Sequence, residues 1–307
     1  MRFCALVATL LLVVPAVWAA EKNESMEHTF TAPEGKRVIV DAGALDVTVR
    51  RAEINEIRLR VELSAGALRE TQAAAWVERH RPTIEDSAAA LRITAPDVRG
   101  VRLFRGVVIS RARLDLVLPP GVRADLATSS GNLIVEGEFA ESRPMRLRSN
   151  SGSIQFTGWV PEVEVRSTSG DMRVHVSRPL DRFLARSASG SITLLGGARE
   201  ARCETSSGSI RLEALLGSLA VTTASGTVNA LFDALQTGSE VRVSTTTGRV
   251  QLTLPPGSQP GGEIASTRGE IRSVYPGQAS TEDRRLILAG KDPKIYVVTA
   301  SGKVELL

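Results

Sequence analysis

The sequence predicts an all-β protein: a right-handed parallel β-solenoid with about twenty residues per coil and a short helix-containing cap at its N-terminal end. Three observations lead to this fold class. A motif in which Ser or Thr stands three residues before a glycine returns nine times along the chain, and in eight of the nine copies Ser or Thr also directly precedes the glycine. Apolar and polar residues alternate on both sides of each copy. Aromatic residues make up only 4% of the 307 residues, so the core must be built from Val, Leu, Ile and Ala.

The first element expected is a secretory signal peptide over residues 1–19. Arg2 precedes an apolar run over residues 3–14, which is too short to span a bilayer comfortably, and small residues follow it. Cleavage is expected after Ala19, and the alternative is an uncleaved anchor. The protein is therefore predicted to be exported, to the periplasm or the cell surface, with no transmembrane segment after cleavage.

A cap over residues 20–120 is expected next. Residues 38–47 fit the repeat as a first, degenerate coil, and a strand follows with Ile57, Leu59, Val61 and Leu63 on one face. Residues 67–80 lack Gly and Pro and predict a short helix, with Leu68, Ala75 and Trp76 as its apolar stripe. Strands at 90–95 and 107–118 lead into the array, and the insert is expected to cover one end of the solenoid.

The repeat array is expected over residues 121–307. Consecutive motif glycines lie 21, 18, 20, 18, 18, 22, 21 and 33 residues apart, and the last interval holds a second insertion, over residues 277–293. The motif glycines are Gly131, Gly152, Gly170, Gly190, Gly208, Gly226, Gly248, Gly269 and Gly302.

Aligning the copies on this glycine gives regular columns. The residues five before, two after and four after the glycine are mostly apolar, and the residue three before is always Ser or Thr. Apolar residues therefore point inward at odd positions before the glycine and at even positions after it. The hydroxyls three and one before it are expected to point inward at a tight corner. Because the inward parity changes there, the glycine is expected in a bulge with positive φ.

A unit of twenty residues with two short strands cannot bury its own apolar face, but successive stacked units can. Nine coils at about 4.8 Å each would form a rod of roughly 40 Å. The crossover rule favours right-handed winding. The alternative is an antiparallel β-sandwich of hairpins, since twenty residues also make one hairpin. Stacking is preferred because one motif, rather than two different turns, recurs in each unit.

Three segments resemble a known bacterial family. They are residues 38–47 (VIVDAGALDV), residues 114–121 (LDLVLPPG) and the Ser-Gly-x-[Ile/Val/Leu] repeats that follow. Together they are similar to the family known as "putative adhesins", a domain of unknown function built of repeated β-strands. The resemblance covers roughly residues 30–307. It implies an exported repeat domain, associated with the cell envelope in many members.

Most candidate chemistry is better explained by structure. Glu162 and Glu164 share one strand face with arginines and predict surface ion pairs rather than an acid/base pair. His175 is expected to point outward into solvent, and Cys203 to be an inert inward residue. Trp159, at a corner, is expected to pack over a strand end, with sugar stacking as the alternative. No catalytic residue, metal site or cofactor is predicted.

One outward feature suggests binding. Arg148, Arg166 and Arg186 occupy the same position in consecutive coils, with Arg146 and Arg202 in the neighbouring outward column. Stacked at about 4.8 Å, these side chains would form a basic stripe. The stripe predicts an anion-binding site, and the alternative is a solvated face relieved by Glu164 and Glu204. The expected partner is an anionic envelope polymer or another protein, and not nucleic acid.

The functional hypothesis is an exported, non-catalytic adhesin-like or envelope-scaffolding protein. A polysaccharide-active or polysaccharide-binding β-helix protein is the first alternative, and an envelope-stress signalling accessory is the second.

Overall fold

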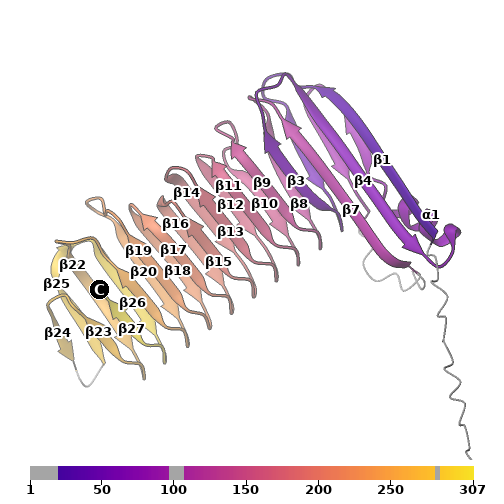
Figure 1. Cartoon of the computed structure of the whole chain (residues 1–307). Helices are drawn as coiled ribbons and strands as arrows, with labels where there is room; N and C mark the ends of the chain where they lie inside the picture. Colours follow the sequence, from indigo (N-terminus) through magenta and orange to yellow (C-terminus); the bar gives the residue numbers. More distant parts are fainter. Residues whose placement is uncertain (1–19, 97–106, 281–283) are drawn as a thin grey trace, which may run out of the picture.

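The computed structural model describes residues 20–96, 107–280 and 284–307. The chain forms a long two-sided stack of strands, with the N-terminal strands at one end and the C-terminal strands at the other (Figure 1). The predicted signal peptide, residues 1–19, lies outside the described residues.

Two sheets form the sides of the stack. Sheet A has thirteen strands, in the spatial order β1 (Ala20–Thr31), β4 (Glu56–Ala67), β7 (Val107–Leu118), β3 (Asp46–Arg51), β9 (Leu133–Glu138), β11 (Ile154–Trp159), β13 (Met172–Val176), β15 (Ile192–Leu195), β17 (Ile210–Leu215), β19 (Val228–Phe232), β21 (Val250–Thr253), β27 (Val304–Leu306) and β23 (Ile271–Ser273).

Sheet B has fourteen strands, in the order β24 (Gly277–Ser280), β25 (Arg285–Asp292), β22 (Gln259–Ser266), β26 (Lys294–Thr299), β20 (Glu240–Thr245), β18 (Ser218–Thr223), β16 (Ala198–Thr205), β14 (Leu180–Arg186), β12 (Glu162–Arg166), β10 (Met145–Ser149), β8 (Arg123–Thr128), β2 (Arg37–Asp41), β6 (Ala90–Thr94) and β5 (Thr83–Asp86).

Each coil contributes one strand to each sheet, and equivalent strands of neighbouring coils pair in parallel, as in β11 with β13 and β12 with β14. This arrangement confirms the β-solenoid and rules out the sandwich of hairpins. The apolar columns point inward as predicted, so that Leu147, Val165, Ile154 and Met172 are fully buried between the sheets. Cys203 continues the same inward column and is also fully buried.

The order of the coils differs from the order of the sequence at both ends. β26 lies between β20 and β22, and β27 lies between β21 and β23, so the last coil of the chain is inserted inside the stack. At the other end, β6 and β7 pair on the outside of β2 and β3, while β8 and β9 pair on their inside. The expectation that successive units stack in chain order is therefore wrong for the terminal coils.

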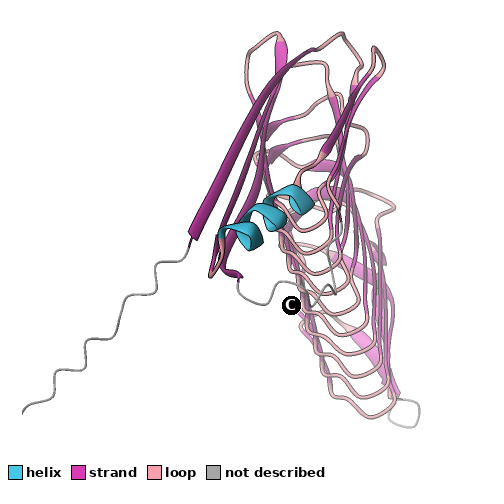
Figure 2. Cartoon of the chain, turned by 90° about the vertical axis from the view of Figure 1, so that its right-hand side faces the viewer, coloured by secondary structure: helices cyan, strands magenta, loops and turns pink. Residues whose placement is uncertain are grey.

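The cap contains the predicted elements. Helix α1 (Glu70–His80) lies across the inner side of the long strands β1, β4 and β7 (Figure 2). Its buried residues are Ala73, Trp76, Val77 and His80. Of the predicted stripe only Trp76 is buried, since Ala75 is exposed and Leu68, which precedes the helix, is 58% exposed. The second insertion forms the antiparallel strands β24 and β25.

The glycine corner differs from the prediction in two respects. The nine motif glycines do not have positive φ. They are required because the coils approach closely: a Cβ on Gly190 would overlap the carbonyl oxygen of Gly170, and one on Gly170 would overlap that of Gly152. The hydroxyl three before the glycine points inward as expected, but the residue one before it, such as Ser169 or Ser189, is exposed.

The inward hydroxyls bond to the corner as predicted. Ser167 and Thr205 accept hydrogen bonds from the backbone N–H of Gly170 and Gly208, at 2.8 and 3.1 Å. These bonds satisfy donors that the corner would otherwise bury without a partner.

Candidate functional site

The predicted arginine stripe is present on the outer face of sheet B. The strand register places Arg148 beside Arg166 and Arg166 beside Arg186, so that the three occupy one row across β10, β12 and β14. All three point away from the core and are exposed. The side chains of Arg166 and Arg186 are 47% and 52% exposed, which leaves their guanidinium groups accessible to a ligand.

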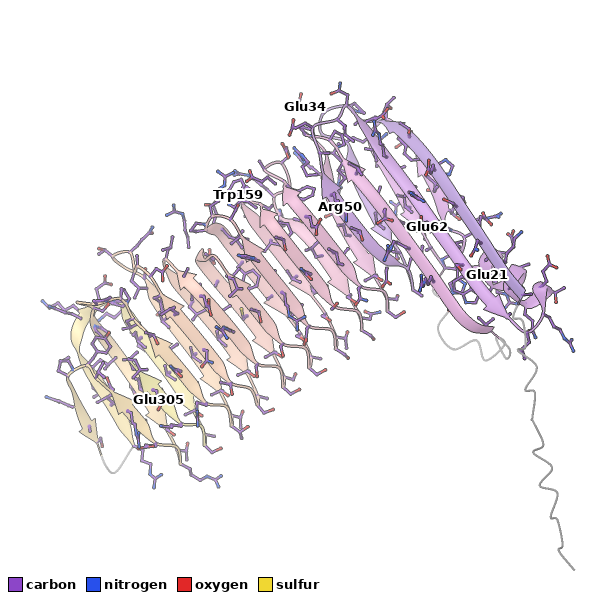
Figure 3. All side chains as sticks on the ribbon, viewed as in Figure 1. Glu21, Glu34, Arg50, Glu62, Trp159 and Glu305 are labelled. Carbon is purple, nitrogen blue, oxygen red and sulfur yellow. The ribbon has the colours of Figure 1, made fainter. Side chains whose placement is uncertain are left out.

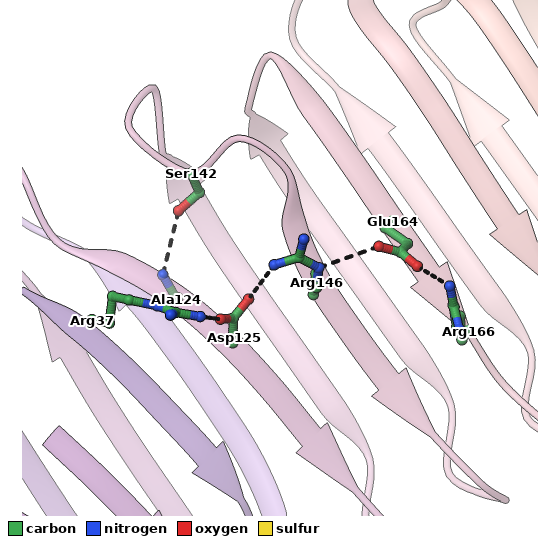
Figure 4. Close-up of polar contacts among 7 residues, drawn as sticks. All are labelled: Arg37, Ala124, Asp125, Ser142, Arg146, Glu164 and Arg166. Atoms are coloured by element: carbon green, nitrogen blue, oxygen red, sulfur yellow. Dashed lines mark hydrogen bonds and ion pairs between the residues drawn. The ribbon is translucent and has the colours of Figure 1, made fainter. Parts of the chain in front are cut away.

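Carboxylates accompany the arginines without matching them in number. Glu164 contacts both Arg146, at 3.3 Å, and Arg166 (Figure 4). Glu204 contacts both Arg186, at 3.0 Å, and Arg202, at 2.9 Å. Two carboxylates are thus shared among four guanidinium groups, so positive charges exceed negative charges by two in this group before Asp125, which also contacts Arg146, is counted.

Arg148 adds a further charge, since it makes no ion pair with any residue that the structure describes. The charged residues in the neighbouring rows of sheet B reduce this excess of positive charge without removing it. Arg182 pairs with Glu200 at 3.2 Å, and Glu162 adds one negative charge. Strands β10, β12, β14 and β16 also carry Arg199 and Asp181, which form an ion pair with each other. Their other outward charged side chains are six arginines and four glutamates: Arg146, Arg148, Arg166, Arg182, Arg186, Arg202, Glu162, Glu164, Glu200 and Glu204.

The ion pairs continue toward the cap. Asp125 lies between Arg37, at 2.5 Å, and Arg146, at 3.6 Å (Figure 4). Sequence reasoning missed Asp125 and Arg37 as members of this surface. Asp125 was detectable, because it stands in the same outward column as Arg146. Arg37 was not, because its pairing with Asp125 depends on the register of β2 with β8.

Two shallow hollows interrupt the row. One, of about 280 Å³, is lined by Arg166, Arg186 and Arg202, with Leu184 among them. The other, of about 380 Å³, lies beside Arg148 and includes Ile39 and Ala127. Each hollow combines guanidinium donors with an apolar side chain. Such a surface can hold anionic groups attached to a ring or chain with an apolar face.

The remaining candidates are structural. Trp159 is the last residue of β11 and lies where that strand ends (Figure 3). The guanidinium carbon of Arg178 lies 3.6 Å from its ring centroid, and its Nε1 donates to the carbonyl of Pro179 at 3.4 Å. One face of the ring is therefore covered, which agrees with packing. His175 is exposed, and burial raises the pKa of the Cys203 thiol far above its usual range. Among the described residues no cluster is suited to hold a metal ion.

A larger hollow than these two lies elsewhere, in the cap. It measures about 940 Å³ and is lined by residues of β1, β4, β7 and α1, including Glu24, Trp76 and His80. Glu24 is engaged with Arg81 at 2.7 Å, and His80 stacks on Trp76 with ring centroids 3.8 Å apart. Glu24 and His80 are thus both held by neighbouring side chains of the cap, and we place the candidate site on sheet B.

None of the helices in the described part of the chain is long and apolar enough to cross a membrane. A family model described as Toastrack DUF4097 matches residues 36–199 and 180–307, which together span most of the chain. Among curated proteins, none matches.

Several solved structures are similar at low sequence identity. A "putative lipid binding protein" of Parabacteroides distasonis is 12% identical, with a TM-score of 0.48 over 93% of this chain and 96% of that one. A "putative adhesin" of the same species is 14% identical, with a TM-score of 0.44 over 92% and 97%. A "putative adhesin" of Bacteroides fragilis is 10% identical, with a TM-score of 0.43 over 92% and 97%.

Proposed function

The chain belongs to the Toastrack DUF4097 family, and from this premise we propose that it is an exported, non-catalytic binding protein of the cell envelope, adhesin-like or scaffolding in role. Its ligand is an anionic envelope polymer, held along the outer face of sheet B. The apolar run and small residues at the start of the chain support export.

The observation that carries this proposal is the in-register row of Arg148, Arg166 and Arg186 with too few carboxylates beside it. Like charges on adjacent strands repel each other, and an anionic partner relieves that repulsion. A linear polyanion is favoured over a small anion because the positive groups repeat along the solenoid axis. Guanidinium groups also form paired hydrogen bonds with carboxylate, sulfate or phosphate oxygens.

The first test is retention on immobilised heparin, used as a model polyanion, across a salt gradient. The protein is compared with a variant in which Arg148, Arg166 and Arg186 are all replaced by Gln. We expect the variant to elute at clearly lower salt and to fold normally. These exposed contacts act within a screening length of about 8–10 Å, and exposed substitutions change stability by roughly 0.5 kcal/mol or less.

A matched control removes the same number of charges from the opposite sheet. Arg50, Arg173 and Arg211 are exposed on sheet A, and each is paired with a nearby carboxylate. Replacing these three by Gln should leave retention nearly unchanged. Equal losses in both triple variants would show that net charge alone governs retention and would overturn the proposed site.

The non-catalytic part of the proposal has its own test. Acidic polysaccharides are incubated with the protein, and their chain length is followed by size-exclusion chromatography. We expect no shortening. Cleavage that disappears on Glu164→Gln or Glu204→Gln would replace this proposal by a polysaccharide-degrading function.

A further inference from the structure

The two ends of the stack are finished in different ways. At the N-terminal end, α1 covers the core, and its Trp76 and Val77 are buried. The outermost strands there are charged: β1 carries Glu21, Glu24 and Glu27, and β5 carries Glu85 and Asp86. Charge on an edge strand prevents other strands from pairing with it.

The C-terminal end lacks both protections among the described residues. There Ile271, Tyr275 and Leu286 pack against the end of the core but stay only partly buried. Val274 is 69% exposed beside the last strand of sheet A. Ile287 on β25 is also exposed, at 54%.

The edge strands at this end are also able to accept a partner. β24 has the uncharged sequence GQAS, and the one charge of β23, Arg272, is paired with Glu270. The backbone N–H of Ala289 donates to the carbonyl of Pro276. In an antiparallel pair every second residue bonds to the partner strand, so the N–H groups of Gly277 and Ala279 point away from β25, toward the unpaired edge of β24. Directly after β23, the backbone N–H of Val274 donates to the carbonyl of Leu306. By the same alternation, the N–H groups of Ile271 and Ser273 point away from β27, toward the unpaired edge of β23.

The end of the stack is stepped. Beyond the coil formed by β22 and β23, sheet B continues for two strands, β25 and β24, whereas sheet A stops at β23. A two-fold axis parallel to the strands, placed between the sheets, exchanges the two layers. Strands β25 and β24 of one copy then fill the gap beyond β23 of the other copy. Each layer therefore holds two strands between the two terminal coils, because the operation is symmetric.

A head-to-tail arrangement does not match in this way. Between the terminal coils of two such copies, sheet A would hold β4 and β1, whereas sheet B would hold β25, β24 and β5. Two strands in one layer cannot run level with three in the other. Joining two N-terminal ends by the same symmetry would place the acidic strands β1 and β5 side by side, which like charges oppose.

We propose that this protein forms a two-fold dimer through its C-terminal end, in which β23 of each copy pairs with β24 of the other and both sheets continue across the interface. The paired strands are antiparallel, because β24 runs with β22, and the strands of sheet A run opposite to β22 within each coil. Main-chain hydrogen bonds hold the join, and the partly buried Ile271, Tyr275 and Leu286 become core.

The test is the molar mass of the purified protein, measured by light scattering after size-exclusion chromatography over a range of concentrations. Ala279→Pro removes one free N–H of β24 without removing a bond to β25. We expect the parent to be a dimer and Ala279→Pro to dissociate at least about tenfold more readily. Ala279→Ser keeps the N–H and serves as the matched control, which should stay dimeric.

A second variant guards against misfolding of the proline variant. Gln278→Lys leaves the backbone intact and places a charge on the edge, which should also weaken the dimer. A monomeric parent at all concentrations, or a dimer that both substitutions leave unchanged, would overturn the proposal. So would a series of growing oligomers, which indicates head-to-tail association. Small-angle scattering of the dimer should show a particle about twice as long as the monomer of Gln278→Lys, and a side-by-side shape would also contradict the model.

Discussion

At the scale of single residues, the glycine ladder decides how closely the coils stack. Each motif glycine faces backbone of the neighbouring coil, as Gly208 faces the carbonyl of Gly190 and Gly226 that of Gly208. A side chain at any of these positions meets rigid backbone rather than a movable side chain. The repeat therefore requires glycine for space and not for an unusual φ.

Gly190→Ala tests this account directly. The added methyl group would overlap the carbonyl of Gly170, so two coils must separate locally. We expect a loss of about 2–3 kcal/mol in the free energy of unfolding, the size of a severe overpacking defect. Chemical denaturation measures it. Ser169→Ala, at an exposed position of the same corner, is the control and should stay within about 0.5 kcal/mol of the parent.

The inward hydroxyls offer a second comparison, because two equivalent threonines differ in bonding. Thr205 Oγ1 accepts from the N–H of Gly208 at 3.1 Å, whereas Thr223 Oγ1 is buried without a hydrogen-bond partner. Thr205→Val should cost about 1–3 kcal/mol because it leaves that donor unsatisfied. Thr223→Val should be neutral or stabilising, and the order of the two melting temperatures checks the prediction. An equal loss in both variants would contradict it.

At the scale of elements, helix α1 couples the cap to pH. Burial lowers the pKa of His80, and its bond to the carbonyl of Trp76 only partly offsets that effect. The folded chain then binds fewer protons than the unfolded chain below about pH 6.5, so this residue lowers stability as the pH falls through that value. Thermal unfolding at pH 5 and pH 7.5 should show a smaller pH-dependent loss in His80→Gln than in the parent. A loss of the same size in both would exclude His80 as the cause.

The elements were largely predictable because their signals are local. Alternation gave the strand faces, and the helix followed from a stretch without Gly or Pro. The apolar stripe of the helix was predicted less well. Leu68 precedes the helix and is exposed, while Ala73 and Val77 contact the long strands of sheet A. Those strands come together from distant parts of the chain, and no local pattern reports which face of the helix they cover.

At the scale of the whole molecule, the order of the coils was not predictable. The motif around Gly302 has the same columns as the motif around Gly269, yet its coil lies on the inner side of that one. Repeats with equivalent faces specify that they stack and leave open which neighbour each one takes. The insertion between β23 and β26 allows the chain to double back, because it supplies the length that the return requires.

The candidate site could likewise be predicted only in part from the sequence. Strand parity placed Arg148, Arg166 and Arg186 in one row, and the register of β10, β12 and β14 confirms that placement. The sharing of Glu164 and Glu204 between pairs of arginines depends on side-chain geometry across strands. Binding of an anionic polymer by this row stays a prediction.

The inserted last coil also determines how the protein responds to tension. A pull on the C-terminus acts on β27 and β26, which are hydrogen-bonded on both sides rather than on one. The chain cannot be peeled coil by coil from this end, as an outermost strand would be. It must be sheared out between two neighbours in both sheets at once, and the outer coil with its hairpin loses its support in the same event. Force applied at the C-terminus therefore meets a mechanically resistant part of the molecule, whereas a solenoid with its last coil outermost would unfold one coil at a time.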